Sequence, residues 1–116
     1  MERIDPIESL RYIPHPLVVV TAGLHDDPRQ RSAMTAAWVT RVSWDPPLVA
    51  VSFGFTRFTL ELVRRFHEFA INVVDERLLK PALELFGKLS GRDVDKFKIA
   101  GVRFGRGRRI RAPILL

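Results

Sequence analysis

A run that changes from strand-like to helix-like composition places an arginine and a threonine at a helix start. The run is Ser52-Phe-Gly-Phe-Thr-Arg-Phe-Thr59, and apolar residues at helical spacing follow it. Helix N-termini favour anions because they carry unpaired N–H groups and the positive end of the helix dipole. Arg57 could donate two hydrogen bonds to phosphate oxygens, and the Thr59 hydroxyl could add another. The alternative is an ordinary helix cap by Thr56 or Thr59, with Arg57 solvated.

A second segment carries small residues where a flat ligand could lie. It runs from Ala33 to Phe53 and joins two strand-like runs at an Asp-Pro-Pro corner. The alternative is that Met34 and Trp38 are simply core residues. A third segment, Ser90-Gly-Arg-Asp-Val-Asp-Lys-Phe97, contains Lys96, which by itself predicts only a surface charge.

Other types of site have little support in the sequence. The three histidines lie on different predicted elements without the spacing of metal ligands, and no Ser-His-Asp or paired-carboxylate arrangement stands out. We therefore expect neither a metal site nor a hydrolytic site, and we assign no catalytic acid or base.

The three segments, in this order along the chain, resemble the flavin-binding signature of the flavin reductase-like domain family, of the flavoredoxin type. The resemblance covers roughly residues 10–116 and implies bound FMN. It implies that small side chains let backbone N–H groups approach the isoalloxazine, that Arg57 binds the phosphate, and that Lys96 reaches the flavin. Many relatives have asparagine where this chain has Ser32. The cofactor-binding residues implied are Ser32, Thr35, Ala36, Ala37, Trp38, Ser52, Arg57, Thr59, Ser90, Gly91 and Lys96.

The same resemblance implies an oxidoreductase. A flavin accepts a hydride and passes electrons onward, while the protein positions and tunes the ring. NAD(P)H is the expected reductant, and a small molecule or a protein is the expected electron acceptor. The resemblance also implies a homodimer with the flavin near the interface.

Composition limits the class of protein. The 116 residues predict one domain, residues 1–116, with enough apolar residues for a core. There is no cysteine, no signal-peptide pattern and no apolar run of the roughly 20 residues that span a bilayer. We therefore expect a cytoplasmic protein without a membrane partner. The net charge of +6 and the run Arg103–Arg111 raise nucleic acid as a partner, but a solvated basic loop is the favoured interpretation.

Hydrophobic periodicity predicts short elements. We expect buried strands at Leu17–Ala22 and Leu48–Phe53, with an alternating run between them from Ala33 to Trp44. A short helix should begin near Phe58, and a strand should follow at Glu68–Val74. The remaining predictions are a helix from Leu78 to Gly87 that starts or kinks at Pro81, a helix capped by Ser90 and Asp93 that runs toward Gly101, and strands at Val102–Phe104 and Ile110–Leu116.

These elements indicate a mainly β protein with short helices and a mostly antiparallel barrel. The resemblance sharpens this to the FMN-binding split β-barrel with Greek-key connections, and it implies further C-terminal strands beyond Leu116. Two alternatives remain open. One is a small basic β-barrel that binds nucleic acid through Arg103–Arg111, and the other is a non-catalytic flavin-binding or structural protein.

Overall fold

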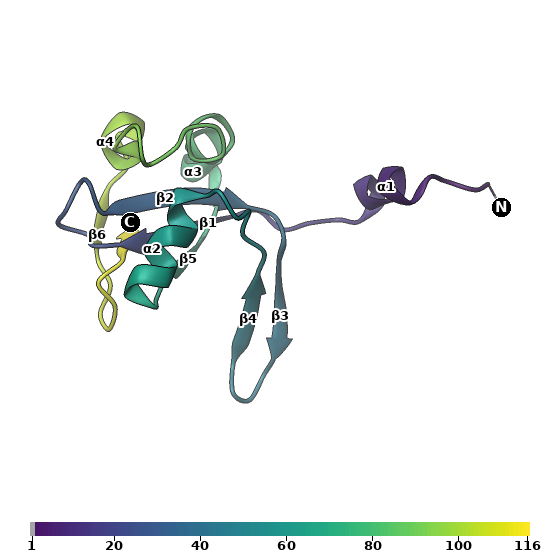
Figure 1. The fold of residues 1–116 in the computed structure, drawn as a ribbon, viewed down its shortest axis with the longest axis horizontal. Helices are drawn as coiled ribbons and strands as arrows, with labels where there is room; N and C mark the ends of the chain where they lie inside the picture. The colour runs from purple at the N-terminus through teal and green to yellow at the C-terminus, as the bar shows by residue number, and fades with distance from the viewer. Residues whose placement is uncertain (1) are drawn as a thin grey trace.

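A computed structural model describes residues 2–116, which form short strands and helices (Figure 1). The helical segments are α1 Pro6–Ser9, η1 Leu10–Tyr12, α2 Phe58–Phe66, α3 Glu76–Pro81, η2 Ala82–Phe86 and α4 Lys96–Ala100. The strands are β1 Val18–Gly23, β2 Arg31–Ala36, β3 Val39–Ser43, β4 Leu48–Val51, β5 Ala70–Val73, β6 Phe104–Arg106 and β7 Pro113–Leu115.

The central sheet has the strand order β2-β1-β5, and both of its strand pairs are antiparallel. Strand β1 is buried along its whole length because it has a neighbour on each side and packing on both faces. Alternate side chains enter different clusters, as the two-residue period of a strand requires. Val19 and Ala33 pack with Phe86 and Phe97 on one face, and Val20 and Met34 belong to the cluster on the other.

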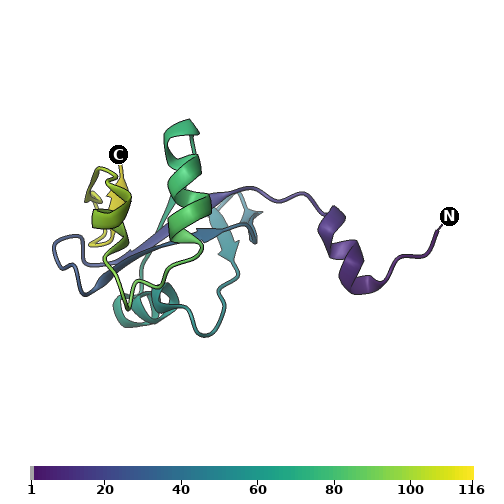
Figure 2. The ribbon, with the colours of Figure 1, turned by 90° about the horizontal axis from the view of Figure 1, so that it is seen from above.

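Helices lie on both faces of this sheet. Figures 1 and 2 show α3 and α4 on one side of β1 and β2, with α2 on the other. The prediction of a helix at Phe58 is confirmed, and its apolar stripe buries Leu62. Among residues 2–116, strand β2 pairs only with β1, and the carbonyl of Ala33 on β2 accepts a hydrogen bond from Lys96 at the start of α4. Residues 88–96 can therefore approach β2 from its open edge.

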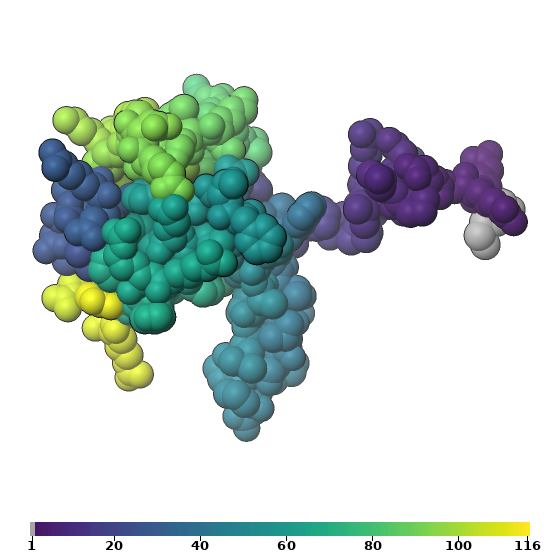
Figure 3. All heavy atoms as spheres, viewed as in Figure 1, coloured from purple at the N-terminus to yellow at the C-terminus, as the bar shows by residue number. Residues whose placement is uncertain are grey.

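The predicted alternating run is interrupted at Ala37 and Trp38, so it forms two strands in different sheets. Strands β3 and β4 pair with each other across the Asp-Pro-Pro turn, as expected. The hairpin projects from the body (Figure 3), and the prediction that β4 is buried is wrong for this chain. Leu48 is 51% exposed and Val49 is 47% exposed because the hairpin has no neighbour on either edge in residues 2–116.

Two of the predicted helices differ in detail from the structure. The helix that contains Pro81 continues beyond the proline, but it changes there from α to π geometry, because proline cannot donate the usual backbone hydrogen bond. The last helix begins at Lys96 rather than just after Ser90. Residues 90–95 form turns in which the N–H groups of Asp93 and Val94 donate to the Ser90 carbonyl, so the expected capping box is wrong.

The arginine-rich run Arg103–Arg111 contains strand β6 and most of the turn that connects it to β7, and its five arginines are exposed. Arg111 forms an ion pair with Glu68 at 3.0 Å, and its backbone N–H also donates to that carboxylate. Whether this loop contacts nucleic acid stays a prediction. Among residues 2–116, no helix is long and apolar enough to cross a membrane.

The fold-class prediction is confirmed: the structure is mainly β, with short helices and antiparallel pairing in all three sheets. The described residues form a three-stranded sheet and two hairpins rather than a closed barrel.

Candidate functional site

Two adjacent cavities lie along β2, and together they are lined by all eleven residues proposed from the sequence. The first has a volume of about 220 Å³ and lies between the start of α2 and the residue 88–96 segment. The second has a volume of about 430 Å³ and lies along the end of β2 and the segment after β4. Met34 and Arg57 line both cavities, so one ligand could extend from one into the other. Ligand pockets typically measure ~300–1,000 Å³.

The residues predicted from the sequence fall into two groups, one at each cavity. Ser32, Thr59, Ser90, Gly91 and Lys96 line the smaller one, and Arg57 lies where they meet. The larger one is lined by Thr35, Ala36, Ala37, Trp38 and Ser52. The residues expected at the phosphate and those expected at the ring therefore line two adjoining cavities, and their roles stay predictions.

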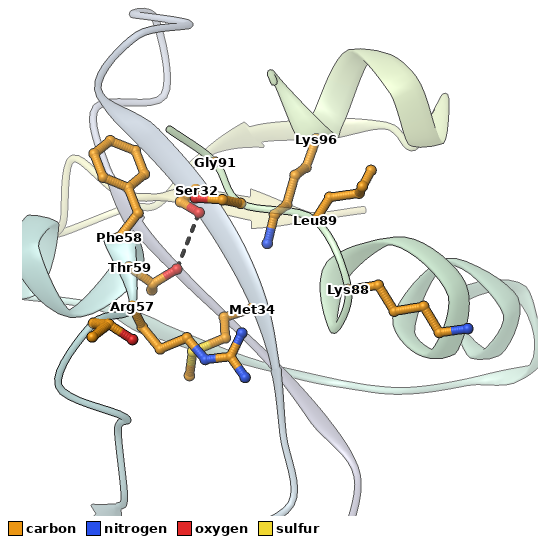
Figure 4. A pocket seen from close by; sticks show the side chains of 11 residues that line it. Ser32, Met34, Arg57, Phe58, Thr59, Lys88, Leu89, Gly91 and Lys96 are labelled. Carbon is orange, nitrogen blue, oxygen red and sulfur yellow. Dashed lines mark hydrogen bonds between the residues drawn. The ribbon is translucent and has the colours of Figure 1, made fainter. Parts of the chain in front are cut away.

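The first turn of α2 is tied to β2 by hydroxyl groups. The buried Thr59 hydroxyl donates to Ser32 Oγ at 3.0 Å (Figure 4). The residue that precedes the helix, Arg57, makes no side-chain capping bond. Neither Thr56 nor Thr59 caps the helix, so that part of the alternative is wrong, although Arg57 is exposed as the alternative expected. The start of α2 lines the smaller cavity.

Lys96 is a buried cation, although the sequence alone would place it on the surface. Its side chain enters the smaller cavity from the start of α4 (Figure 4), and the residue is only 4% exposed. The ammonium donates to the carbonyl oxygens of Ala33 at 2.8 Å and Phe86 at 3.0 Å. These bonds use two of its three donors and leave one for a ligand.

The electrostatics of the smaller cavity favour an anion. Burial lowers the pKa of Lys96, because it disfavours the charged ammonium, and the nearby Arg57 guanidinium lowers it further by repelling a second positive charge. Together they bring the pKa to about 8. Among residues 2–116, neither cation forms an ion pair with a carboxylate. Two cations that face one cavity without a counter-ion would be stabilised by a bound anion.

The residue 90–95 loop closes on β2 at a glycine. A Cβ atom at Gly91 would meet Ser32 Oγ in a severe clash and would lie 2.9 Å from Phe58 Cδ2. The loop is also held to α2, because Arg92 donates to both carboxylate oxygens of Glu61 at 2.5 and 2.6 Å. The close approach of Gly91 therefore forms one wall of the smaller cavity.

The larger cavity is bordered by the break between β2 and β3. Trp38 is 65% exposed at its edge, so the interpretation of this residue as core is wrong, whereas Met34 is 5% exposed and does belong to the core. The Thr35 hydroxyl donates to the Ala82 carbonyl on η2, so it is already engaged within the protein. The backbone and the small side chains of Ala36 and Ala37 remain for contact with a flat ligand.

Sequence reasoning missed several lining residues. From the sequence, Met34 is considered only as a core residue, yet its side chain lies on the same face of β2 as those of Ser32 and Ala36, and this alternation could have placed it at the cavity. Nothing in the local sequence marks the rim residues Lys88 and Leu89, because the fold alone brings that turn over β2. Among residues 2–116, no group of three or more potential metal ligands occurs.

Comparisons with known proteins identify relatives of this chain. The family model for the flavin reductase like domain matches residues 10–116. A protein of Aeropyrum pernix is 33% identical over 116 residues, which cover 99% of this chain and 43% of that relative. Flavoredoxin of Desulfovibrio vulgaris (Miyazaki F) matches with a TM-score of 0.85 and 27% identity, over 99% of this chain and 61% of its own.

A third similar protein is the FMN-binding protein from Thermus thermophilus, whose structure contains bound 1-cyclohex-2-enone. It matches with a TM-score of 0.76 and 27% identity, over 99% of this chain and 61% of its own. The present chain thus spans less than two thirds of each of these three proteins. The chain belongs to the flavin reductase-like domain family.

Proposed function

We propose that this chain binds FMN and takes part in flavin-dependent oxidoreduction. One observation carries the proposal: within residues 2–116, Arg57 and Lys96 face the smaller cavity without a carboxylate partner, beside a larger cavity lined partly by small and apolar side chains. A phosphate dianion would supply the missing negative charge, and the larger cavity would hold the ring. The FMN named for the Thermus thermophilus relative supports FMN as the flavin.

In this proposal, Arg57 and Lys96 hold the phosphate by charge-assisted hydrogen bonds, and the hydroxyl groups of Thr59 and Ser32 complete its surroundings. Ser90 and Gly91 form the wall beside them. Ala36 and Ala37 let the backbone approach the ring, while Trp38 and Ser52 border it. When bound, the flavin supplies hydride acceptance and onward electron transfer. The protein contributes binding and orientation, and no side chain is assigned proton transfer.

NAD(P)H is the proposed reductant, and a small molecule or a protein is the proposed acceptor. We also propose a cytoplasmic homodimer, in which the second copy of the chain would cover the exposed β3–β4 hairpin.

The test compares FMN with riboflavin, which lacks the phosphate. Arg57→Ala should weaken FMN binding by about ten- to a hundredfold, because charged hydrogen bonds contribute about 1.5–3 kcal/mol. Riboflavin affinity should change little. The measurement is fluorescence titration, with a circular dichroism spectrum to show that the fold is intact.

Arg64→Ala is the matched control, since Arg64 is exposed on the same helix and lines neither cavity. It should bind both ligands as the unmodified protein does. Equal FMN affinity in the Arg57 and Arg64 variants would overturn the phosphate assignment. Failure of the well-folded unmodified protein to take up FMN would overturn the proposed function itself.

A further inference from the structure

A buried arginine lies one residue before Ser32 and interacts with the residue before Lys96. Arg31 donates from Nη2 to Asp95 Oδ2 at 2.7 Å and from Nε to Oδ1 at 3.3 Å. The two side chains are only 10% and 16% exposed. Each partner is the immediate neighbour of a residue that lines the smaller cavity, so this ion pair joins β2 to the start of α4 beside the site.

Arg31 is fixed by more than this pair. Its Nη1 atom donates to the His25 carbonyl oxygen at 2.7 Å. Its guanidinium carbon lies 4.5 Å from the ring centroid of Phe104 and 5.4 Å from that of Phe97, distances at which a cation and an aromatic face attract. The guanidinium therefore has a defined position, and the carboxylate that it binds is held in place with it.

The carboxylate of Asp95 has two other possible uses that the structure does not show. Asp95 is the N-cap residue of α4, where aspartate commonly accepts a backbone hydrogen bond, yet it makes no side-chain cap. It also precedes Lys96, but within residues 2–116 the ion pair of Asp95 is with Arg31 and not with Lys96. Arg31 donates to both carboxylate oxygens, so the Asp95 side chain is held on the side of Arg31.

We propose that Arg31 is a positioning residue for the anion site, because by holding the Asp95 carboxylate away from Lys96 it leaves that ammonium for an anionic ligand. The inference rests on the proposed function and extends it to a residue outside the cavity lining. Without Arg31, a buried carboxylate would stay beside the site without its partner. That negative charge would compete with the ligand for Lys96 and would repel it.

The proposal predicts opposite effects for the two partners. Arg31→Met should weaken binding of FMN and of inorganic phosphate by at least about tenfold, because it leaves the carboxylate uncompensated. Asp95→Asn should not weaken binding, since it removes the group that Arg31 restrains. The double variant Arg31→Met/Asp95→Asn should recover most of the loss. A purely structural ion pair would instead weaken binding in both single variants, because each leaves one buried charge without its partner, so the Asp95→Asn variant separates the two accounts.

A second pair of residues supplies the control. Arg92 and Glu61 also hold the residue 90–95 loop, but their side chains are 43% and 44% exposed and screened by solvent. Arg92→Met should change ligand affinity much less than Arg31→Met. Thermal melting of every variant identifies any that fail to fold. If Arg31→Met fails to fold, the folded Asp95→Asn variant still tests the proposal, because weakened binding in that variant contradicts it.

A ligand-independent measurement separates this inference from the proposed function. The pH dependence of Lys96 acetylation, followed by mass spectrometry, reports its pKa, and Arg57 is the other charge that faces it. Arg31→Met should raise that pKa, because the freed carboxylate favours the ammonium, while Asp95→Asn should not raise it. An unchanged pKa in Arg31→Met overturns the inference. Absent FMN binding by the unmodified protein overturns only the proposed function.

Discussion

The ammonium nitrogen of Lys96 lies 2.8 Å from the carbonyl oxygen of Ala33, which joins the first residue of α4 to the open edge of β2. The bond brings a cation from the last helix of the chain to the strand that lines both cavities. Among residues 2–116, Lys96 forms no ion pair with a carboxylate, so this hydrogen bond to a carbonyl leaves the positive charge of the ammonium without a counter-ion. The following predictions depend on this arrangement.

Replacing the buried ammonium should separate binding from stability. Lys96→Met should weaken FMN binding by about tenfold or more, since a charged hydrogen bond contributes about 1.5–3 kcal/mol. The free energy of unfolding should change less than ligand binding does, because relief from burying a charge opposes the loss of the hydrogen bonds to the Ala33 and Phe86 carbonyls. Ligand titration and urea denaturation measure the two effects. Lys98→Met, on the exposed side of α4, is the control and should change neither.

Lys96 should also make stability depend on pH. Its pKa is lowered from 10.5 to about 8, chiefly by burial. Between these values the unfolded chain holds a proton that the folded chain has lost, so the free energy of unfolding should rise as pH increases through this range. FMN affinity should fall over the same range because the ammonium is lost. Thermal melts and titrations on either side of pH 8 test this, and Lys96→Met should flatten both profiles.

Gly91 should tolerate no side chain. In Gly91→Ala the new methyl group would clash with Ser32 Oγ and lie 2.9 Å from Phe58 Cδ2, which forces the loop away from β2. We expect a loss of about 1–3 kcal/mol in the free energy of unfolding and weaker FMN binding. Gly105→Ala is the control, because its methyl group would lie 3.6 Å from Leu116 Cδ1, an ordinary contact. Equal stability of the two variants would contradict this account of the loop.

The exposed hairpin should contribute to self-association. Trp44 is 81% exposed, and exposed tryptophans are common among the residues that dominate protein interfaces. If the proposed homodimer uses this hairpin, Trp44→Ser should weaken it by about 2 kcal/mol. Sedimentation equilibrium measures the change. Tyr12→Ser serves as the control, since Tyr12 is 76% exposed on the N-terminal segment. Equal dimer strength in both variants would exclude the hairpin as the interface.

The sequence by itself determined the local elements that a short run of residues encodes. The β-branched run after Leu17 predicts β1, and the change of period after Gly54 predicts α2, because neither depends on a distant partner. The resemblance carried by the three motif segments also implied eleven residues, all of which line the two cavities. The predicted role of each of these residues stays a prediction.

Only the tertiary structure decided which side chains are buried and which charges meet. The composition of β4 is that of a buried strand, yet its hairpin projects from the body, because burial requires a covering surface that local sequence does not encode. The local sequence around Lys96 predicts a surface charge, but packing across β2 buries the side chain near Arg57. Arg31 and Asp95 are 64 residues apart, and only the fold brings them together.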